Sequence, residues 1–342
     1  MKAMVLTELS DLRENRSPLR PTELPVPEPK DNEILIKISA CGVCHTELDE
    51  IEGRTPPSRL PIIPGHQVIG RIEGRGAKAR RFRAGERVGI AWIHYACGRC
   101  HFCLGGYENL CDAFKATGRD VDGGYGEYTT VHENFAYRIP EVFSDSEAAP
   151  LLCAGAVGYR SLKLCGLKDG ETLGLTGFGA SAHLVIMTAR YLYPNSRVFV
   201  FSRTDRERDF ARELGAFWAG AIGDAPTEKL RAAIDTTPAW KPVLETLQNL
   251  EKGGRLVINA IRKEEGDKDA LLGLDYPRHI WMEKEIKSVA NVGRNDVEEF
   301  LRIAGEMPIR PQIEEFGLEE ANEALGELKE RRIRGAKVLR IG

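Results

Sequence analysis

The chain has 342 residues, of which 42% are hydrophobic and 29% are charged, and its formal net charge is −3. At about 150 residues per domain, this length predicts two domains that need no disulfides to hold their cores. The composition excludes a disordered chain and a dedicated nucleic-acid binder. The opening sequence MKAMVLTELSDLREN has no secretory apolar core, and no stretch reaches the roughly 20 apolar residues of a membrane span. We therefore expect a cytoplasmic protein with no membrane and no nucleic-acid partner.

The first part of the chain predicts short strands separated by turn residues and long loops. An extended, proline-rich entry at residues 21–29 comes first. Strands are then expected at residues 33–40, 68–73, 86–90 and 128–131. This pattern indicates a mostly β unit.

From about residue 148, strands and helices alternate, which predicts an α/β unit with a parallel sheet and right-handed crossovers. The expected strands are 172–176, 197–201, 232–235, 255–258 and 286–289, and the expected helices are 180–191, 205–214 and 243–250. Thr204 and Glu207 form a capping box that starts helix 205–214, and Gly215 ends it. Asn295 is expected to cap a helix to about residue 304, and helix 319–328 and strand 337–341 complete the chain.

Eight cysteines in a reducing compartment indicate metal or catalytic chemistry before disulfides. Four of them follow the pattern C-x2-C-x2-C-x7-C: Cys97, Cys100, Cys103 and Cys111. Four thiolates this close together predict a closed, tetrahedral, structural zinc site. An iron-sulfur cluster is disfavoured by the spacing of the last pair. A zinc ribbon for nucleic acid is disfavoured because the loop has few basic residues, and free or buried thiols are the remaining alternative.

Three further segments supply a second set of metal-ligating side chains. They are CGVCHTE at residues 41–47, PGHQ at residues 64–67 and LLCAG at residues 151–155. One Cys, one His and a distant Cys are the ligands of a catalytic zinc whose fourth position stays open. Spacing alone does not choose between Cys41 and Cys44 as the first ligand.

With these motifs, the chain resembles the zinc-dependent medium-chain alcohol dehydrogenases over nearly its full length, and within them the NADPH-linked, aldehyde-reducing branch. The resemblance implies a GroES-like, mostly β catalytic domain at residues 1–147 and 293–342, and a Rossmann domain at residues 148–292. It also implies Cys44, His66 and Cys153 as ligands of the catalytic zinc, so two zinc ions per chain are expected. Cys41 and Cys165 are then small packing residues.

The resemblance implies roles for several other side chains. Thr46 would hydrogen-bond the reacting oxygen and pass on its proton, although from sequence alone it could equally cap the following helix. Asp49 replaces a relay histidine, so the proton would leave through His45, Asp49 or water. His45 would also lie near the cofactor pyrophosphate. Trp92 would line a pocket for small apolar substrates, unless it is a plain core or surface tryptophan.

Two positions depart from the family pattern. Gln67 replaces the usual Glu after the ligand histidine, which is expected to remove a charge beside the zinc ligands and to alter zinc exchange. Ala336 replaces an arginine that binds cofactor phosphate, and Lys337 or Arg334 could only partly substitute for it.

The sequence LGLTGFGASAH contains G-x-G-x-x-A between an expected strand and an expected helix. The glycines allow a tight turn and a close approach of backbone amides to a pyrophosphate, whereas Ala182 allows close helix packing. The residues expected to bind the cofactor here are Gly177, Phe178, Gly179 and Ala180. The alternative is a glycine-rich turn that binds no ligand.

The end of the second strand of this unit carries Ser202 and Arg203 where a site for NAD presents an acid. A guanidinium binds the 2′-phosphate that distinguishes NADP, so NADP(H) is the expected cofactor. NAD(H) remains the alternative if Arg203 only decorates a solvated loop and Asp205 takes the role of the acid.

These observations together predict a zinc-dependent alcohol dehydrogenase or aldehyde reductase for primary alcohols and aldehydes. The resemblance implies a homodimer or homotetramer, because an edge strand near Arg294 commonly joins subunits in the resembled family. Two alternatives are a zinc-free reductase of the same fold, acting on quinones or enones, and a non-catalytic nucleotide-binding redox sensor.

Overall fold

The computed structural model describes residues 1–307, 309–332 and 334–342, which form two compact units. The first unit consists of Met1–Ala156 and Val292–Gly342, and the second of Val157–Asn291. The first unit thus continues beyond the boundary expected at residue 147. The reason is the 3-10 helix η3 (Ala149–Leu152), whose four residues are all buried and which packs against the large sheet of the first unit.

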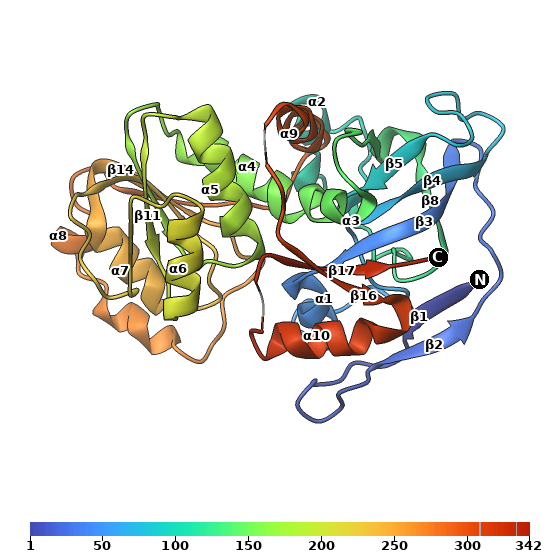
Figure 1. Ribbon diagram of the computed structural model, residues 1–342, viewed down its shortest axis with the longest axis horizontal. Coiled ribbons are helices and arrows are strands. Elements are labelled where there is room, and N and C mark those ends of the chain that lie inside the picture. Colours follow the sequence, from blue (N-terminus) through green and yellow to red (C-terminus); the bar gives the residue numbers. More distant parts are fainter. Residues whose placement is uncertain (308, 333) are drawn as a thin grey trace. The chain divides into compact units, whose positions relative to one another are not determined.

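A seven-stranded sheet, in the order β16–β17–β3–β4–β5–β9 with β8 paired to β3, organises the first unit. Its strands are β3 (Glu33–Val43), β4 (Val68–Arg75), β5 (Arg87–Ile90), β8 (Tyr128–His132), β9 (Ala136–Arg138), β16 (Ile313–Gly317) and β17 (Ala336–Arg340). Two smaller ribbons are β1 (Lys2–Leu6) with β2 (Leu19–Glu23), and β6 (Ile93–Tyr95) with β7 (Lys115–Ala116). Strand β17 runs antiparallel to β3, with Leu339 opposite Cys41, so the last strand of the chain completes a sheet begun near its start (Figure 1).

The first unit also contains several helices. They are α1 (His45–Ile51), α2 (His101–Leu104), α3 (Asp145–Ala148), α9 (Arg294–Glu306) and α10 (Ala321–Lys329). Helix α10 lies beside α1, where Lys329 Nζ is 2.7 Å from Glu52 Oε2 (Figure 1). The prediction that Asn295 caps α9 is wrong, because the cap is Gly293, whose amide donates to Asp296 at 3.0 Å.

The second unit contains a six-stranded, wholly parallel sheet in the order β12–β11–β10–β13–β14–β15. Its strands are β10 (Thr172–Thr176), β11 (Arg197–Phe201), β12 (Trp218–Gly220), β13 (Leu230–Asp235), β14 (Leu250–Ile258) and β15 (Glu285–Ser288). The helices are α5 (Ala180–Leu192), α6 (Asp205–Glu213), α7 (Lys241–Asn249) and α8 (Tyr276–His279), and α4 (Ala154–Cys165) begins in the first unit. The strand order reverses between β10 and β13, which is where doubly wound sheets bind nucleotides. The α/β fold class is confirmed.

Strand β15 forms one edge of this sheet, and all four of its residues are exposed. This is the edge strand nearest in sequence to Arg294, which is itself the first residue of α9 in the other unit. No helix within the described ranges has the length and apolar character needed to cross a bilayer.

Candidate functional site

The first helix begins at a cysteine. Cys44 follows the end of β3, is the N-cap of α1, and has an extended backbone. Its Sγ accepts the amide of Thr46 at 3.3 Å, and its own amide donates to Glu47 Oε2 at 2.8 Å. This reciprocal capping box fixes the direction of the Cys44 side chain. The alternative in which Thr46 caps α1 is therefore wrong.

Three side chains that are far apart in the sequence meet in the first unit. Ligand atoms of Cys44, His66 and Cys153 all lie within 4.8 Å of one another, and Cys44 Sγ is 3.7 Å from His66 Nε2. Tetrahedral zinc with usual bond lengths would separate a sulfur and a nitrogen ligand by about 3.6 Å. The geometry thus fits a zinc ion. Cys41 lies outside this group, and its buried Sγ is 3.6 Å from the carbonyl of Gly42.

A buried carboxylate orients the histidine of this group. Glu47 Oε1 is 2.5 Å from His66 Nδ1, and neither side chain has any exposed surface. Because Nδ1 contacts this carboxylate, Nε2 is the nitrogen that faces Cys44. Although burial lowers it, the charges of Glu47 and Cys44 hold the pKa of His66 well above its usual range. A metal ion therefore competes with a proton at His66, and we expect binding to weaken at low pH.

Glu47 has a functional position that the sequence analysis missed. Its signal was its place three residues after Cys44 in the first turn of a helix, which predicts a cap but not a contact with His66. The expected effect of Gln67 on zinc exchange stays a prediction. Gln67 is buried, and its carbonyl accepts the Gly42 amide at 3.0 Å. A second buried carboxyl, Glu50, has a pKa raised well above its usual range by burial and then by Glu47.

The residues predicted to move protons and to contact substrate lie at different places in the first unit. Thr46 is buried next to Cys44, and the edge of the Trp92 ring packs on the His66 ring with centroids 5.0 Å apart. Asp49 is also buried, and its Oδ1 accepts Nε of Arg54 at 2.5 Å. His45 is exposed at the start of α1, and its contact with a cofactor stays a prediction.

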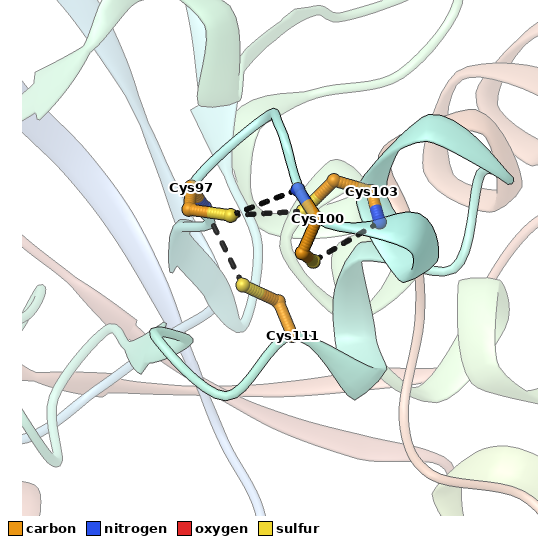
Figure 2. Close-up of side chains that lie close together, drawn as sticks. All are labelled: Cys97, Cys100, Cys103 and Cys111. Atoms are coloured by element: carbon orange, nitrogen blue, oxygen red, sulfur yellow. Dashed lines mark hydrogen bonds between the residues drawn. The ribbon is translucent and has the colours of Figure 1, made fainter.

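The four cysteines of the loop around α2 also converge (Figure 2). The sulfur atoms of Cys97, Cys100, Cys103 and Cys111 lie within 4.8 Å of one another. Cys97 and Cys103 have sulfurs 3.9 Å apart, and two tetrahedral zinc ligands at the usual bond length would be about 3.8 Å apart. Backbone amides of Arg99 and Cys100 lower the pKa of the Cys97 thiol to about 6, whereas burial and then Cys100 raise that of Cys103 to about 12. Clustered thiols cannot all ionise without a cation, so this donor set also fits zinc.

This loop is attached to α9. Glu108 is almost completely buried, and its Oε1 accepts Nε of Arg294 at 2.9 Å. Gly293, the cap of α9, packs against the same carboxylate. The cysteine loop therefore contacts the residues at which the chain re-enters the first unit.

The glycine-rich motif occupies the turn between β10 and α5 in the second unit. Gly177 has a φ of 83°, and its amide donates to the carbonyl of Phe201, the last residue of β11, at 2.8 Å. Gly179 is the N-cap of α5, and a Cβ atom placed there would meet nothing within 4 Å. The open space in front of a helix N-terminus fits a pyrophosphate. Phe178 is instead buried, and its ring packs edge-on against Phe210 of α6.

The remaining predicted cofactor residues follow these elements. Ala180 is the first residue of α5, and Arg203 is exposed after the end of β11. Ser202 is completely buried, and its hydroxyl donates to Glu207 Oε2 at 2.5 Å. Asp205, the alternative acid for NAD, accepts Nη2 of Arg208 at 2.5 Å.

One predicted substitute for the missing phosphate-binding arginine is engaged elsewhere in the first unit. Lys337 is buried, and its ammonium donates to Glu314 at 2.5 Å and to Glu327 at 2.6 Å. It already satisfies two carboxylates and is not placed for a phosphate.

Comparison with known proteins agrees with this arrangement. Residues 30–141 match the family model described as "Alcohol dehydrogenase GroES-like domain". The chain is 42% identical over 329 residues to "Probable alcohol dehydrogenase AdhA" of Mycobacterium tuberculosis, covering 95% of this chain and 93% of that protein. It is 32% identical over 350 residues to an alcohol dehydrogenase of Geobacillus stearothermophilus, covering 100% and 99% of the two chains.

Among solved structures, a cinnamyl alcohol dehydrogenase from Sorghum bicolor superimposes with a TM-score of 0.83 at 26% identity. The match covers 99% of this chain and 97% of that one. The chain therefore belongs to the family of zinc-type medium-chain alcohol dehydrogenases.

Proposed function

We propose that this protein is a cytoplasmic, zinc-dependent alcohol dehydrogenase that interconverts primary alcohols and aldehydes, prefers NADP(H) and holds two zinc ions per chain. Its family supports alcohol and aldehyde oxidoreduction with a nicotinamide cofactor. The observation that carries the proposal is the buried group of Cys44, His66 and Cys153, in which Glu47 holds the far side of the histidine. Three such ligands suit a catalytic zinc, whereas the four-cysteine loop suits a structural one.

Zinc, when bound by these three residues, polarises the oxygen of an alcohol or aldehyde, and the nicotinamide carries the hydride. Around that chemistry, the chain's own residues have distinct tasks. Glu47 keeps His66 in one tautomer and one orientation. Thr46, buried beside Cys44, is proposed to accept the alcohol proton and to return it in the reverse direction, with His45, Asp49 or water as the next carrier. Trp92, packed on His66, is proposed to give the substrate pocket an apolar wall.

The second unit is proposed to bind the cofactor at the turn between β10 and α5. Gly177, whose amide is bonded to Phe201, would supply the tight turn, and the backbone amides of residues 178–180 would hold the pyrophosphate at the N-terminus of α5. The absence of an acid at position 202 and the exposed Arg203 support NADP(H), because a guanidinium binds a 2′-phosphate that a carboxylate would repel.

The proposal is tested by following NADPH oxidation with a panel of short aldehydes, together with zinc analysis of the same preparation. We expect turnover, two zinc ions per chain, and loss of turnover in the His66→Ala variant. Full activity in a metal-free preparation would identify a zinc-free reductase instead. Nucleotide binding without any turnover would identify a non-catalytic sensor.

Self-association through the second unit is also proposed, as a homodimer or as a tetramer built from such dimers. The exposed edge strand β15 can pair with the same strand of a second copy, since antiparallel edges are self-complementary. Two large apolar side chains in or shortly before this strand are exposed: Ile286 to 47% and Trp281 to 53%. Burying them against a second copy would remove an apolar surface from water.

A further inference from the structure

The end of β11 and the glycine-rich turn form one cluster with α6. The Gly177 amide is bonded to the Phe201 carbonyl at 2.8 Å, and the Phe178 ring packs on Phe210 of α6 with centroids 5.6 Å apart. In a doubly wound sheet, the residue after the second strand lies beside the adenosine ribose of a bound dinucleotide. Ser202 directly follows Phe201, the last residue of β11, so it occupies this position in the chain.

A carboxylate reaches Ser202, although the strand itself carries no acid. Glu207 lies in the first turn of α6, and its Oε2 accepts the Ser202 hydroxyl at 2.5 Å. The same oxygen faces the Thr204 amide at 3.5 Å, and the Glu207 amide donates to Thr204 Oγ1 at 3.2 Å. The next helix thus brings a carboxylate to the residue that follows the strand.

Two arginines lie close to Glu207 in the sequence. Arg208 donates to the Ser202 carbonyl at 2.8 Å and to Asp205 at 2.5 Å, so a backbone carbonyl and a second carboxylate share its guanidinium. Arg203 is exposed. A 2′-phosphate bound beside Ser202 would approach the charge of Glu207, whereas a ribose hydroxyl could donate to that carboxylate.

We propose that Glu207 is a specificity-determining residue for the nicotinamide cofactor, which limits the preference for NADP(H) and allows NAD(H) to be used. The inference rests on the proposed function, because it concerns the same cofactor site. Glu207 acts on binding of the ribose and takes no part in hydride transfer. Its removal therefore changes the selectivity between the two cofactors and not the chemistry common to both.

The test measures kcat/KM for NADPH and NADH with one aldehyde, in the wild-type protein and in Glu207→Gln. Glutamine preserves the capping box but removes the charge. We expect the NADPH-to-NADH ratio of kcat/KM to rise at least about tenfold, which corresponds to about 1.4 kcal/mol. Glu207→Asp, which retracts the carboxylate by one methylene, should give a ratio between those of wild type and Glu207→Gln. It also serves if the glutamine variant is unstable.

The matched control is Asp209→Asn, which removes the same charge from the same helix at a side chain paired with Arg212. It should leave the ratio unchanged. A ratio in Glu207→Gln equal to that of the control would overturn the inference and leave Glu207 as a helix cap. Fluorescence titration of the wild-type protein with NADPH and NADH shows whether such a result contradicts only the role of Glu207 or also the proposed function. Binding of neither nucleotide would contradict both, whereas binding of both with an unchanged ratio would contradict only the role of Glu207.

Discussion

Replacing Glu47 by glutamine should selectively weaken one of the two proposed zinc sites. The Glu47 carboxylate is completely buried and contacts the equally buried His66 Nδ1 at 2.5 Å. Hydrogen bonds to charged groups contribute about 1.5–3 kcal/mol, and loss of a partner behind a metal-bound histidine lowers metal affinity about 10–100-fold. Glutamine keeps an acceptor oxygen and can still serve in the capping box, so the helix should form. We expect zinc affinity at Cys44, His66 and Cys153 to fall about 10–100-fold, or about 1.4–2.7 kcal/mol.

The assay is competition for zinc between the protein and a chromophoric chelator, which resolves two classes of zinc by affinity. In Glu47→Gln, one zinc per chain should be lost at a lower chelator concentration, and the zinc of the four-cysteine loop should be retained as in wild type. Glu50→Gln is the matched control, because Glu50 is buried on the same helix and acts on His66 through charge, whereas Glu47 makes the short contact with its Nδ1. Equal zinc affinities in wild type and Glu47→Gln would refute the role assigned to Glu47. A simultaneous loss of both zinc ions would show general unfolding instead.

Three further predictions address other parts of the chain. Cys97→Ser should reduce the zinc content from two ions to one and lower the melting temperature, and unchanged stoichiometry by metal analysis would exclude the structural site. Because Lys337 holds the pKa of Glu327 below its ordinary value of 4.5, this pair stabilises the fold above that pH and the contribution is lost as the pH falls through the lower, folded-state pKa. Denaturant unfolding should therefore show wild type more stable than Glu327→Gln at neutral pH, with a gap that narrows below pH 4.5; a gap independent of pH would contradict this reasoning. Ile286→Lys should shift the protein toward monomers in light scattering, and an unchanged molar mass would place the interface elsewhere.

The second unit was predicted closely because its local signals agree with its tertiary structure. The strands at 172–176 and 197–201 have the predicted bounds, and the capping box of Thr204 and Glu207 forms as expected. Buried parallel strands are short apolar runs between turn signals, so the sequence marks them directly. Strand β12 was not predicted, because three residues between a helix and a loop carry no clear periodicity.

The first unit shows what sequence patterns leave open. The four-cysteine motif could be identified as a metal site from spacing, since all four cysteines lie in one loop. The ligands of the proposed catalytic site could not all be chosen from spacing, because Cys44, His66 and Cys153 come together only through the tertiary structure. Cys41 and Cys44 differ by their place relative to the end of β3, which spacing does not reveal. Glu47 was missed for the same reason, since its partner His66 lies in a different loop. Strand β16, with its polar sequence, has no apolar alternation to mark it.

The first unit is built from two separate stretches of the chain, so it can be completed only after the second unit has been synthesised. Residues 292–342 leave the ribosome after the second unit, yet β17 supplies a neighbour to β3, and Arg294 binds Glu108 across 186 positions of sequence. The parallel sheet of the second unit consists only of residues made before them. The second unit can therefore fold while the first still lacks strands and the anchor of its cysteine loop. During that interval the thiols of the loop are without their final packing, so early capture of zinc would protect them from oxidation until the chain closes.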